Sequence, residues 1–338
     1  MILYYLENRQ AIRNQEMPNY TNETSIDSVE KENVYLFVAV CNILLACFTF
    51  PGNGLLLLAL FKDPLGCFNT PTTLLVKSMT IANLITSLLV EPLTAASKIS
   101  VLNKGKVSPV MKEITEFVTI IAPNASFLTV FALSLDSFVA VSRPLKYKVI
   151  VTKRNVFICM ALIWGYITCF ALLPFSGLSY NQHMEIDLYV NTTVTLMLLL
   201  ASYFGLIKSL STNRTRSLSL HTNNKDFYAS SSRDLCLERS RRSLQAVVVL
   251  VLVLTLTIVP NMVSWMLYFH CGFCKNRPGF LVTIAALRYL AYLKFLCDPF
   301  VYAWRLPRYR RALKMVIFCR NTKPVGLENS RNATWNQS

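Results

Sequence analysis

The chain has 338 residues, of which 53% are hydrophobic and only 15% are charged. Soluble domains carry charge on about a quarter of their residues, so this composition favours a membrane protein. The net charge of +16 would suit a nucleic-acid-binding protein. That class is excluded because the basic residues lie between long apolar runs, and we expect no nucleic-acid partner.

Residues 1–33 are predicted to form an extracellular tail, because they are polar and contain no long apolar run. Met1–Leu6 is apolar but too short for the core of a signal peptide, so the first spanning helix is expected to direct its own insertion. Asn19 and Asn22 each begin an N-x-Thr sequon and are predicted to carry glycans.

Seven apolar stretches follow, each near the length of about 20 residues that a helix needs to cross a bilayer. They are Tyr35–Phe61, Thr73–Ala96, Pro109–Val141, Val156–Phe175, Leu188–Leu210, Leu244–Phe269 and Leu281–Trp304. Lipid satisfies no backbone hydrogen bonds, and no repeating strand pattern indicates a barrel. Residues 34–304 are therefore predicted to form an all-α bundle of seven transmembrane helices.

Lys and Arg residues indicate how this bundle is oriented. They are concentrated in the second and third inner loops and after the seventh span, and are sparser on the opposite side. The positive-inside rule then places the N-terminus outside the cell and the C-terminus in the cytoplasm of a plasma-membrane protein. A sequon at Asn191, assigned to the second outer loop, fits this orientation and is predicted to be glycosylated.

Residues 305–320 differ in character from the spans before them. Their apolar side chains repeat at helical spacing, and their arginines face elsewhere. This pattern predicts an amphipathic helix on the anionic inner leaflet, with Cys319 as a candidate palmitoylation site. Residues 321–338 would form a cytoplasmic tail.

Two of the cysteines fall in the predicted outer, oxidising compartment. Cys271 and Cys274 are close enough in sequence to form a disulfide that closes a tight loop, and the alternative is a pair of free thiols. No αβ pattern around them indicates a redox site.

Charged residues within the predicted helices are functional leads, because each is costly in lipid unless it is paired or hydrated. Lys294 and Asp298 lie one helical turn apart and can pair. Glu91, Glu116 and Arg288 lie in the outer parts of the second, third and seventh helices and are candidates for a polar ligand pocket. The alternative is that these three side chains extend toward the membrane interface.

Short motifs along the chain resemble those of the rhodopsin-like G-protein-coupled receptors. In chain order they are Gly52-Asn53, Ile81-Ala82-Asn83-Leu84, Leu135-Asp136-Ser137-Phe138, Trp164 with Pro174, Pro260, and Asp298-Pro299-Phe300-Val301-Tyr302. Each motif is weak alone, but the ordered set is specific and covers roughly Tyr35–Cys319. The sequence after Tyr302, and the lack of a cysteine pair joining helix three to the second outer loop, are similar to the melanocortin and adenosine receptors.

This resemblance implies a cell-surface receptor that binds an extracellular ligand and signals to a heterotrimeric G protein, with arrestin as a further partner. Pro260 and Pro299 would act as helix hinges. Asp136, Ser137 and Tyr147 would lie at the G-protein face. The family has an arginine where this chain has Ser137, so the resemblance supports the receptor fold more strongly than efficient coupling.

The resemblance also implies a polar network in the middle of the bundle. Its predicted members are Asn53, Asn83, Ser126, Lys294, Asp298 and Tyr302. Most of the family binds a sodium ion there with an aspartate on helix two. Here that position is Asn83, and the acid is Asp298 on helix seven. We expect the Lys294 ammonium to replace the ion; the alternative is a protonated Asp298, with Lys294 directed at backbone carbonyls.

Other functions are weighed against the receptor. A receptor-fold protein that binds ligand or partners without signalling, as a decoy or dimer subunit, is the main alternative. A transporter or channel would be expected to show inverted repeats, which are not apparent. The three histidines are scattered and no catalytic motif is present, so we expect neither an enzyme nor a metal or cofactor. The acids of the outer pocket suit a cationic peptide or amine, whereas Arg288 suits an anionic group.

Overall fold

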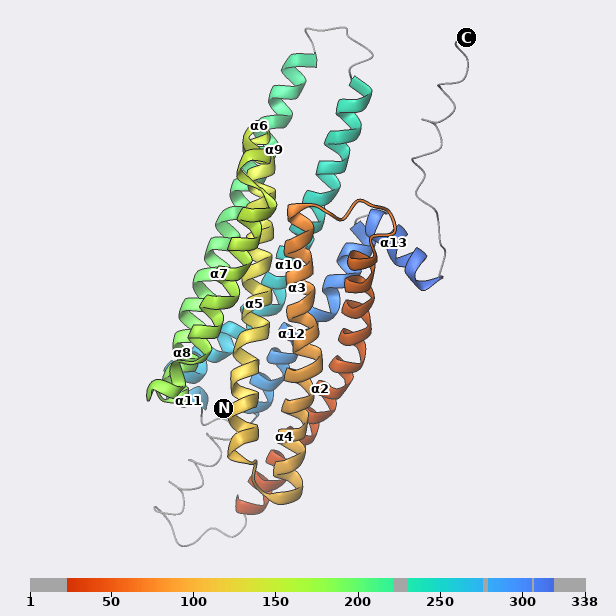
Figure 1. Ribbon diagram of the computed structural model, residues 1–338. Helices are drawn as coiled ribbons and strands as arrows, with labels where there is room; N and C mark the ends of the chain where they lie inside the picture. Colours follow the sequence, from red (N-terminus) through yellow and green to blue (C-terminus); the bar gives the residue numbers. More distant parts are fainter. Residues whose placement is uncertain (1–22, 222–229, 276–278, 306, 319–338) are drawn as a thin grey trace, which may run out of the picture.

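A computed structural model describes residues 23–221, 230–275, 279–305 and 307–318 (Figure 1). This part of the chain consists of helices and connecting turns, and it contains no strand. Seven of its segments are long and apolar enough to cross a membrane. The predicted fold class, an all-α bundle of seven spans, is therefore confirmed.

Each span is built from one helix or from several that follow one another. The spans are α2 (Glu23–Lys62); α3 (Pro71–Ile85), η1 (Thr86–Val90) and α4 (Glu91–Lys104); α5 (Pro109–Ser142); α7 (Lys153–Ala171); α8 (Tyr180–Ile186), η3 (Asp187–Val194) and α9 (Thr195–His221); α10 (Ser230–His270); and α12 (Phe280–Arg305). The short helices are α6 (Pro144–Ile150), η2 (Leu173–Ser176), α11 (Gly272–Lys275) and α13 (Pro307–Ile317). The segments η1 and η3 are π-helical, a geometry often found at functional sites.

Local sequence accounts for where several helices begin. The Thr70 hydroxyl accepts a hydrogen bond from the Thr73 backbone nitrogen at 3.3 Å, and Pro71 occupies the first turn of α3, where its missing N–H costs nothing. Thr152 caps α7 in the same way through the Asn155 nitrogen at 3.2 Å. These caps hold the inner ends of the two helices in defined positions.

Two boundaries differ from the predicted ones. The first helix begins at Glu23, so residues 23–33 of the predicted tail continue α2. The fifth span begins near Tyr180 rather than Leu188, because the Ser179 capping box starts a helix that η3 and α9 continue. Residues that looked like an outer loop are therefore part of a membrane span.

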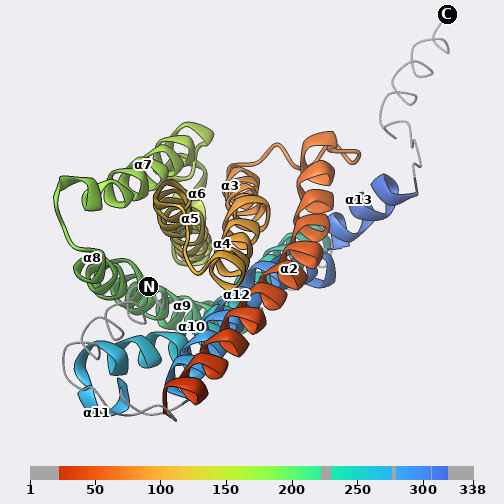
Figure 2. The same cartoon turned by 90° about the horizontal axis from the view of Figure 1, so that it is seen from below.

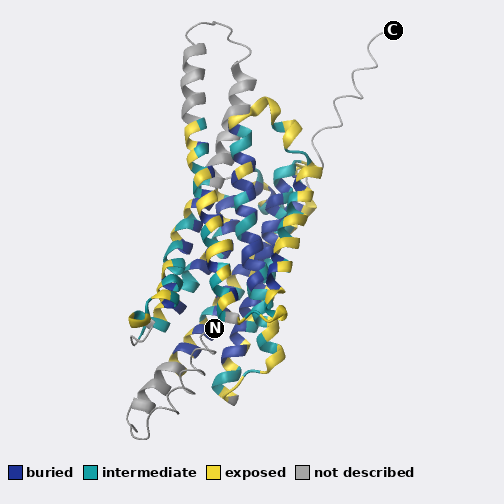
Figure 3. Ribbon diagram, turned by 90° about the vertical axis from the view of Figure 1, so that its left-hand side faces the viewer, coloured by how far each residue is buried: buried dark blue, intermediate teal, exposed yellow. Residues whose placement is uncertain are grey.

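The helix α5 lies at the centre of the bundle, where it packs against α3, α7, α9 and α10 (Figure 2). Buried residues are concentrated in the interior of the bundle, and exposed ones on its outside (Figure 3). Large apolar side chains such as Phe48, Phe204 and Leu256 are exposed on that outer surface, as expected of helices that face lipid. The polar residues described below lie inside.

The predicted helix after the seventh span is present as α13, which packs against α2 and α12. Tyr309 attaches it to the bundle, with ring centroids 4.7 Å from Phe68 and 5.4 Å from Tyr302. The candidate palmitoylation site Cys319 lies outside the described residues.

Candidate functional site

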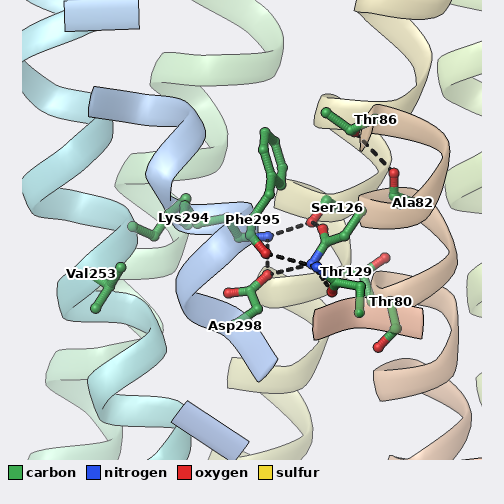
Figure 4. Close-up of polar contacts among 12 residues, drawn as sticks. Thr80, Ala82, Thr86, Ser126, Thr129, Val253, Lys294, Phe295 and Asp298 are labelled. Atoms are coloured by element: carbon green, nitrogen blue, oxygen red, sulfur yellow. Dashed lines mark hydrogen bonds and ion pairs between the residues drawn. The ribbon is translucent and has the colours of Figure 1, made fainter. Parts of the chain in front are cut away.

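The centre of the bundle contains a buried ion pair on α12. Lys294 Nζ lies 2.8 Å from Asp298 Oδ2, and both side chains are 1% exposed. The same ammonium donates a hydrogen bond to Ser126 Oγ on α5 (Figure 4). It also lies 5.0 Å from the ring centroid of Phe295 and 5.7 Å from that of Phe127, which adds cation–π attraction. The lysine thus connects two helices through a charge compensated within the protein.

Two asparagines extend this pair to α2 and α3. Asn83 Nδ2 donates to Asp298 Oδ2 at 2.8 Å and to Asn53 Oδ1 at 3.1 Å. Asn83 Oδ1 accepts from Ser126 Oγ at 2.7 Å, so the asparagine amide is used on both sides. Asn53 Nδ2 donates to the Phe295 carbonyl at 2.9 Å. We call Asn53, Asn83, Ser126, Lys294 and Asp298 the core network.

The structure brings these five predicted residues together and leaves the sixth apart. Tyr302 is buried, but its hydroxyl has no hydrogen-bond partner in the described part of the chain. Its ring packs on Tyr309 of α13. Tyr302 therefore contributes to the contact with α13 rather than to the core network.

The two predicted hinge prolines lie within continuous helices, Pro260 in α10 and Pro299 in α12. Pro299 faces α2 at Gly52, where a Cβ atom would lie 3.2 Å from Pro299 Cγ. A larger residue at Gly52 would push α2 away from α12, because a contact that short requires one neighbour to move. The glycine of the Gly-Asn motif thus has a packing role beside the core network.

A second polar cluster lies at the predicted inner face. Asp136 accepts a hydrogen bond from Thr72 at 2.9 Å and another from the Tyr147 hydroxyl at 3.0 Å. Burial and the Asp136 charge raise the pKa of Tyr147 to about 12, so this hydroxyl remains a donor at neutral pH. Ser137 is buried beside the cluster. Sequence reasoning missed Thr72, because only the fold places it opposite α5.

The predicted outer pocket residues lie apart from one another in their contacts. The Arg288 guanidinium covers the Tyr292 ring at 5.4 Å and donates to the Tyr292 hydroxyl at 3.1 Å. Glu91 is 0% exposed, and neither of its carboxylate oxygens has a hydrogen-bond partner among the described residues. Glu116 is half-buried on α5, and its Oε1 also has no partner within the same ranges.

A further buried cluster was not found from the sequence. Asn124 on α5 and Asn191 on η3 donate hydrogen bonds to Asp187 Oδ1 at 2.9 and 2.8 Å. Asn191 Oδ1 accepts from Tyr166 at 2.8 Å. Asn191 is only 3% exposed, and its nitrogen, which would carry a glycan, is directed at Asp187. The predicted glycan on Asn191 is therefore wrong, because a sequon is a local pattern and does not report burial.

The remaining predicted sites are at the ends of the bundle. Cys271 and Cys274 form a disulfide in the turn after α10, with Cα atoms 5.3 Å apart. The sequons at Asn19 and Asn22 lie outside the described residues.

These features define the class: a multi-pass membrane protein whose seven-helix bundle surrounds a polar core. Residues 52–302 match the family model described as "7 transmembrane receptor (rhodopsin family)". The chain belongs to this family of G-protein-coupled receptors, which are receptors and not enzymes.

Individual proteins support this assignment. The chain is 28% identical to the histamine H2 receptor of Cavia porcellus over 52% of this chain and 47% of that one. It is 30% identical to 5-hydroxytryptamine receptor 1 of Drosophila melanogaster over 34% of this chain and 20% of that one. It is 25% identical to the cannabinoid receptor type 1B of Takifugu rubripes over 63% and 49% of the two chains. The matches thus span half or less of each relative.

Squid rhodopsin shares the fold, with a TM-score of 0.72 over 91% of this chain and 93% of that chain. The sequence identity in this superposition is 16%, so the likeness concerns the fold alone.

Proposed function

We propose that this chain is a plasma-membrane receptor that binds an extracellular ligand and signals to a heterotrimeric G protein. The observation that carries the proposal is the core network, a buried ion pair hydrogen-bonded across α2, α3, α5 and α12 in a rhodopsin-family bundle. Ionisable groups inside a membrane bundle are costly and mark functional positions. A network shared by four helices can favour one packing of those helices over another when a ligand shifts them.

The proposed orientation places the N-terminus outside and the cluster of Asp136, Ser137 and Tyr147 at the cytoplasmic face. Pro260 and Pro299 are the proposed joints about which the inner ends of α10 and α12 move, because a proline leaves a helix without one backbone hydrogen bond. The G protein would bind at this inner face, with arrestin as a second partner. The basic residues of the inner loops support this orientation.

The ligand is proposed to enter near Glu91, Glu116 and Arg288. Three relatives are named as receptors for 5-hydroxytryptamine, histamine and dopamine, which supports small amines as the first compounds to test. The resemblance to a cannabinoid receptor supports including apolar ligands in the same screen.

A second candidate function is a receptor-fold protein that binds ligand without signalling. It is favoured by Ser137, which replaces the arginine of the family motif with a short neutral side chain. A serine can neither pair with Asp136 nor reach a G protein as an arginine does. Thr72 and Tyr147 satisfy Asp136 in its place.

The two functions are separated by a ligand-free assay of G-protein activation in cells that express the parent chain and Ser137→Arg. Ser142→Arg is the matched control, because Ser142 is exposed near the end of the same helix. Signalling by the parent, or a gain confined to Ser137→Arg, would support the coupled receptor. Silence of all three proteins at equal surface expression would favour the non-signalling alternative.

A further inference from the structure

Buried oxygen atoms without hydrogen-bond partners gather where α4 and α5 face each other. Within the described ranges they are both carboxylate oxygens of Glu91, Oγ1 of Thr94, Oε1 of Glu116 and Oγ1 of Thr119. Glu91 is 0% exposed and Thr94 is 6% exposed. Buried polar atoms in folded proteins are nearly always paired, so a group of five unpaired acceptors indicates a missing partner.

The packing of the two helices sets the level of this group. Toward the α4–α5 connection, Ser97 and Thr115 share a hydrogen bond of 3.4 Å. Deeper in the bundle, Val90 and Ala122 are fully buried in one apolar cluster with Tyr292 of α12. Because α4 and α5 are joined by a short turn and run antiparallel, the unpaired oxygens lie between these two layers, at the predicted outer end of the bundle.

The cations of the neighbourhood do not satisfy Glu91. Lys98 Nζ lies over the Tyr35 ring at 5.4 Å from its centroid. Arg288 lies over Tyr292 and donates to its hydroxyl. Neither forms an ion pair or hydrogen bond with the Glu91 carboxylate. A buried carboxylate without a donor or counter-ion is strongly unfavourable, and Glu91 is therefore poised to receive a cation.

We infer that the Glu91 carboxylate binds the protonated amine of a ligand that enters between α4 and α5. This inference rests on the proposed receptor function and specifies the ligand class of its outer site. An ammonium group has three N–H donors and no acceptor, which matches a site made of carboxylate and hydroxyl oxygens. Thr94 and Thr119 take part as acceptors, and Glu116 supplies the second negative charge near the entrance.

Two other ligand classes fit these atoms less well. An anionic group would meet two carboxylates and no free donor on α4 or α5 within the described part of the site. A metal ion needs several strong ligands, and the described residues contain no group of three or more His, Cys, Asp or Glu side chains placed to hold one. A single buried carboxylate surrounded by hydroxyls suits an organic ammonium ion.

The test measures the unfolding temperature of the purified full-length protein in detergent, with phenethylamine and histamine as probes. The uncharged compound 2-phenylethanol is the isostere of the first probe. We expect at least one amine to raise the unfolding temperature of the parent in a saturable way, and the alcohol to leave it unchanged. Glu91→Gln should weaken the affinity for that amine by about tenfold or more, because a charge-assisted hydrogen bond is lost.

The control variant is Glu113→Gln, which removes an exposed carboxylate from the same end of α5 and should bind the amine as the parent does. Without amine, Glu91→Gln should be at least as stable as the parent, since it removes an uncompensated charge. Should Glu91→Gln fail to fold, Thr119→Val provides the second test and should weaken amine binding several-fold.

The inference is overturned if Glu91→Gln and the parent are stabilised equally, or if neither amine stabilises the parent. Stabilisation by calcium chloride but not by the amines would overturn it in favour of a metal site. The measurement needs no G protein, so a chain that fails to signal can still bind the amine, and the two proposals can fail separately.

Discussion

The ammonium of Lys294 and the carboxylate of Asp298 lie 2.8 Å apart on one turn of α12, where both side chains are 1% exposed. Ser126 and Asn83 hydrogen-bond to the lysine and the aspartate and to each other, so the pair is held on two sides. The cation at the centre of this receptor is therefore covalently attached to the chain. It cannot dissociate when the helices move, and its charge can only be displaced together with α12.

This pairing predicts a non-additive double-mutant cycle. Lys294→Met or Asp298→Asn alone leaves one buried charge without its partner, which should lower the free energy of unfolding by about 3–5 kcal/mol. The double variant should lose less than either single one. Unfolding in detergent is the measurement, and the parent should respond equally to sodium and potassium. Lys77→Met is the control and should have a small effect, because Lys77 is only half-buried over the Phe61 ring. Additive losses, or stabilisation of the parent by sodium alone, would contradict the pairing.

Tyr147 is predicted to restrain the inner face. Tyr147→Phe removes the 3.0 Å hydrogen bond to Asp136 and should destabilise the resting packing by about 1–3 kcal/mol. The raised pKa of Tyr147 implies that its contribution is complete below the ordinary tyrosine pKa and is lost as the pH rises toward 12. Basal G-protein activation should therefore increase in Tyr147→Phe, measured at matched surface expression. An unchanged basal level in a variant of equal stability would show that Asp136 is held well enough by Thr72 alone.

The close contact between α5 and α9 predicts a steric effect at Gly205. A Cβ atom there would lie 2.9 Å from Phe138 Cε2, so Gly205→Ala should shift the ring and cost about 1–3 kcal/mol. Gly165→Ala is the matched control, since its Cβ would meet nothing within 4 Å, and it should be neutral or slightly stabilising. Thermal unfolding compares the two. Adding Phe138→Leu should restore part of the loss at Gly205, and equal stability of both alanine variants would refute the contact.

Burial predicts that Asn191 carries no glycan. Thr193→Ala destroys the sequon but keeps the asparagine, and it should leave the electrophoretic mobility of the protein from a secretory cell unchanged. Substitution of Asn19 and Asn22 by Gln is the positive control and should increase mobility if the N-terminus lies outside the cell. Faster migration of Thr193→Ala would show that η3 is open when the glycan is added.

The number and type of the spans could be predicted from the sequence because each depends on a local property. A run of about 20 apolar residues must become a helix in lipid, since no other partner is available for its backbone. The pairing of Lys294 with Asp298 is local in the same sense, because residues four apart share a helix face. Pro71 after Thr70 likewise marks the start of α3 without reference to any other helix.

The rest was decided by contacts between distant parts of the chain. Thr72 and Asp136 are 64 residues apart in sequence, and Asn124 and Asp187 are 63 apart, so no local pattern could show that they meet. The same holds for Asn191, whose sequon is intact but whose side chain faces the interior. Composition and spacing determine which segments become helices and which residues share a face. Only the packing of α5 against its neighbours decides which of those faces meet, because the energy of a buried polar group depends on the partner that the fold brings to it.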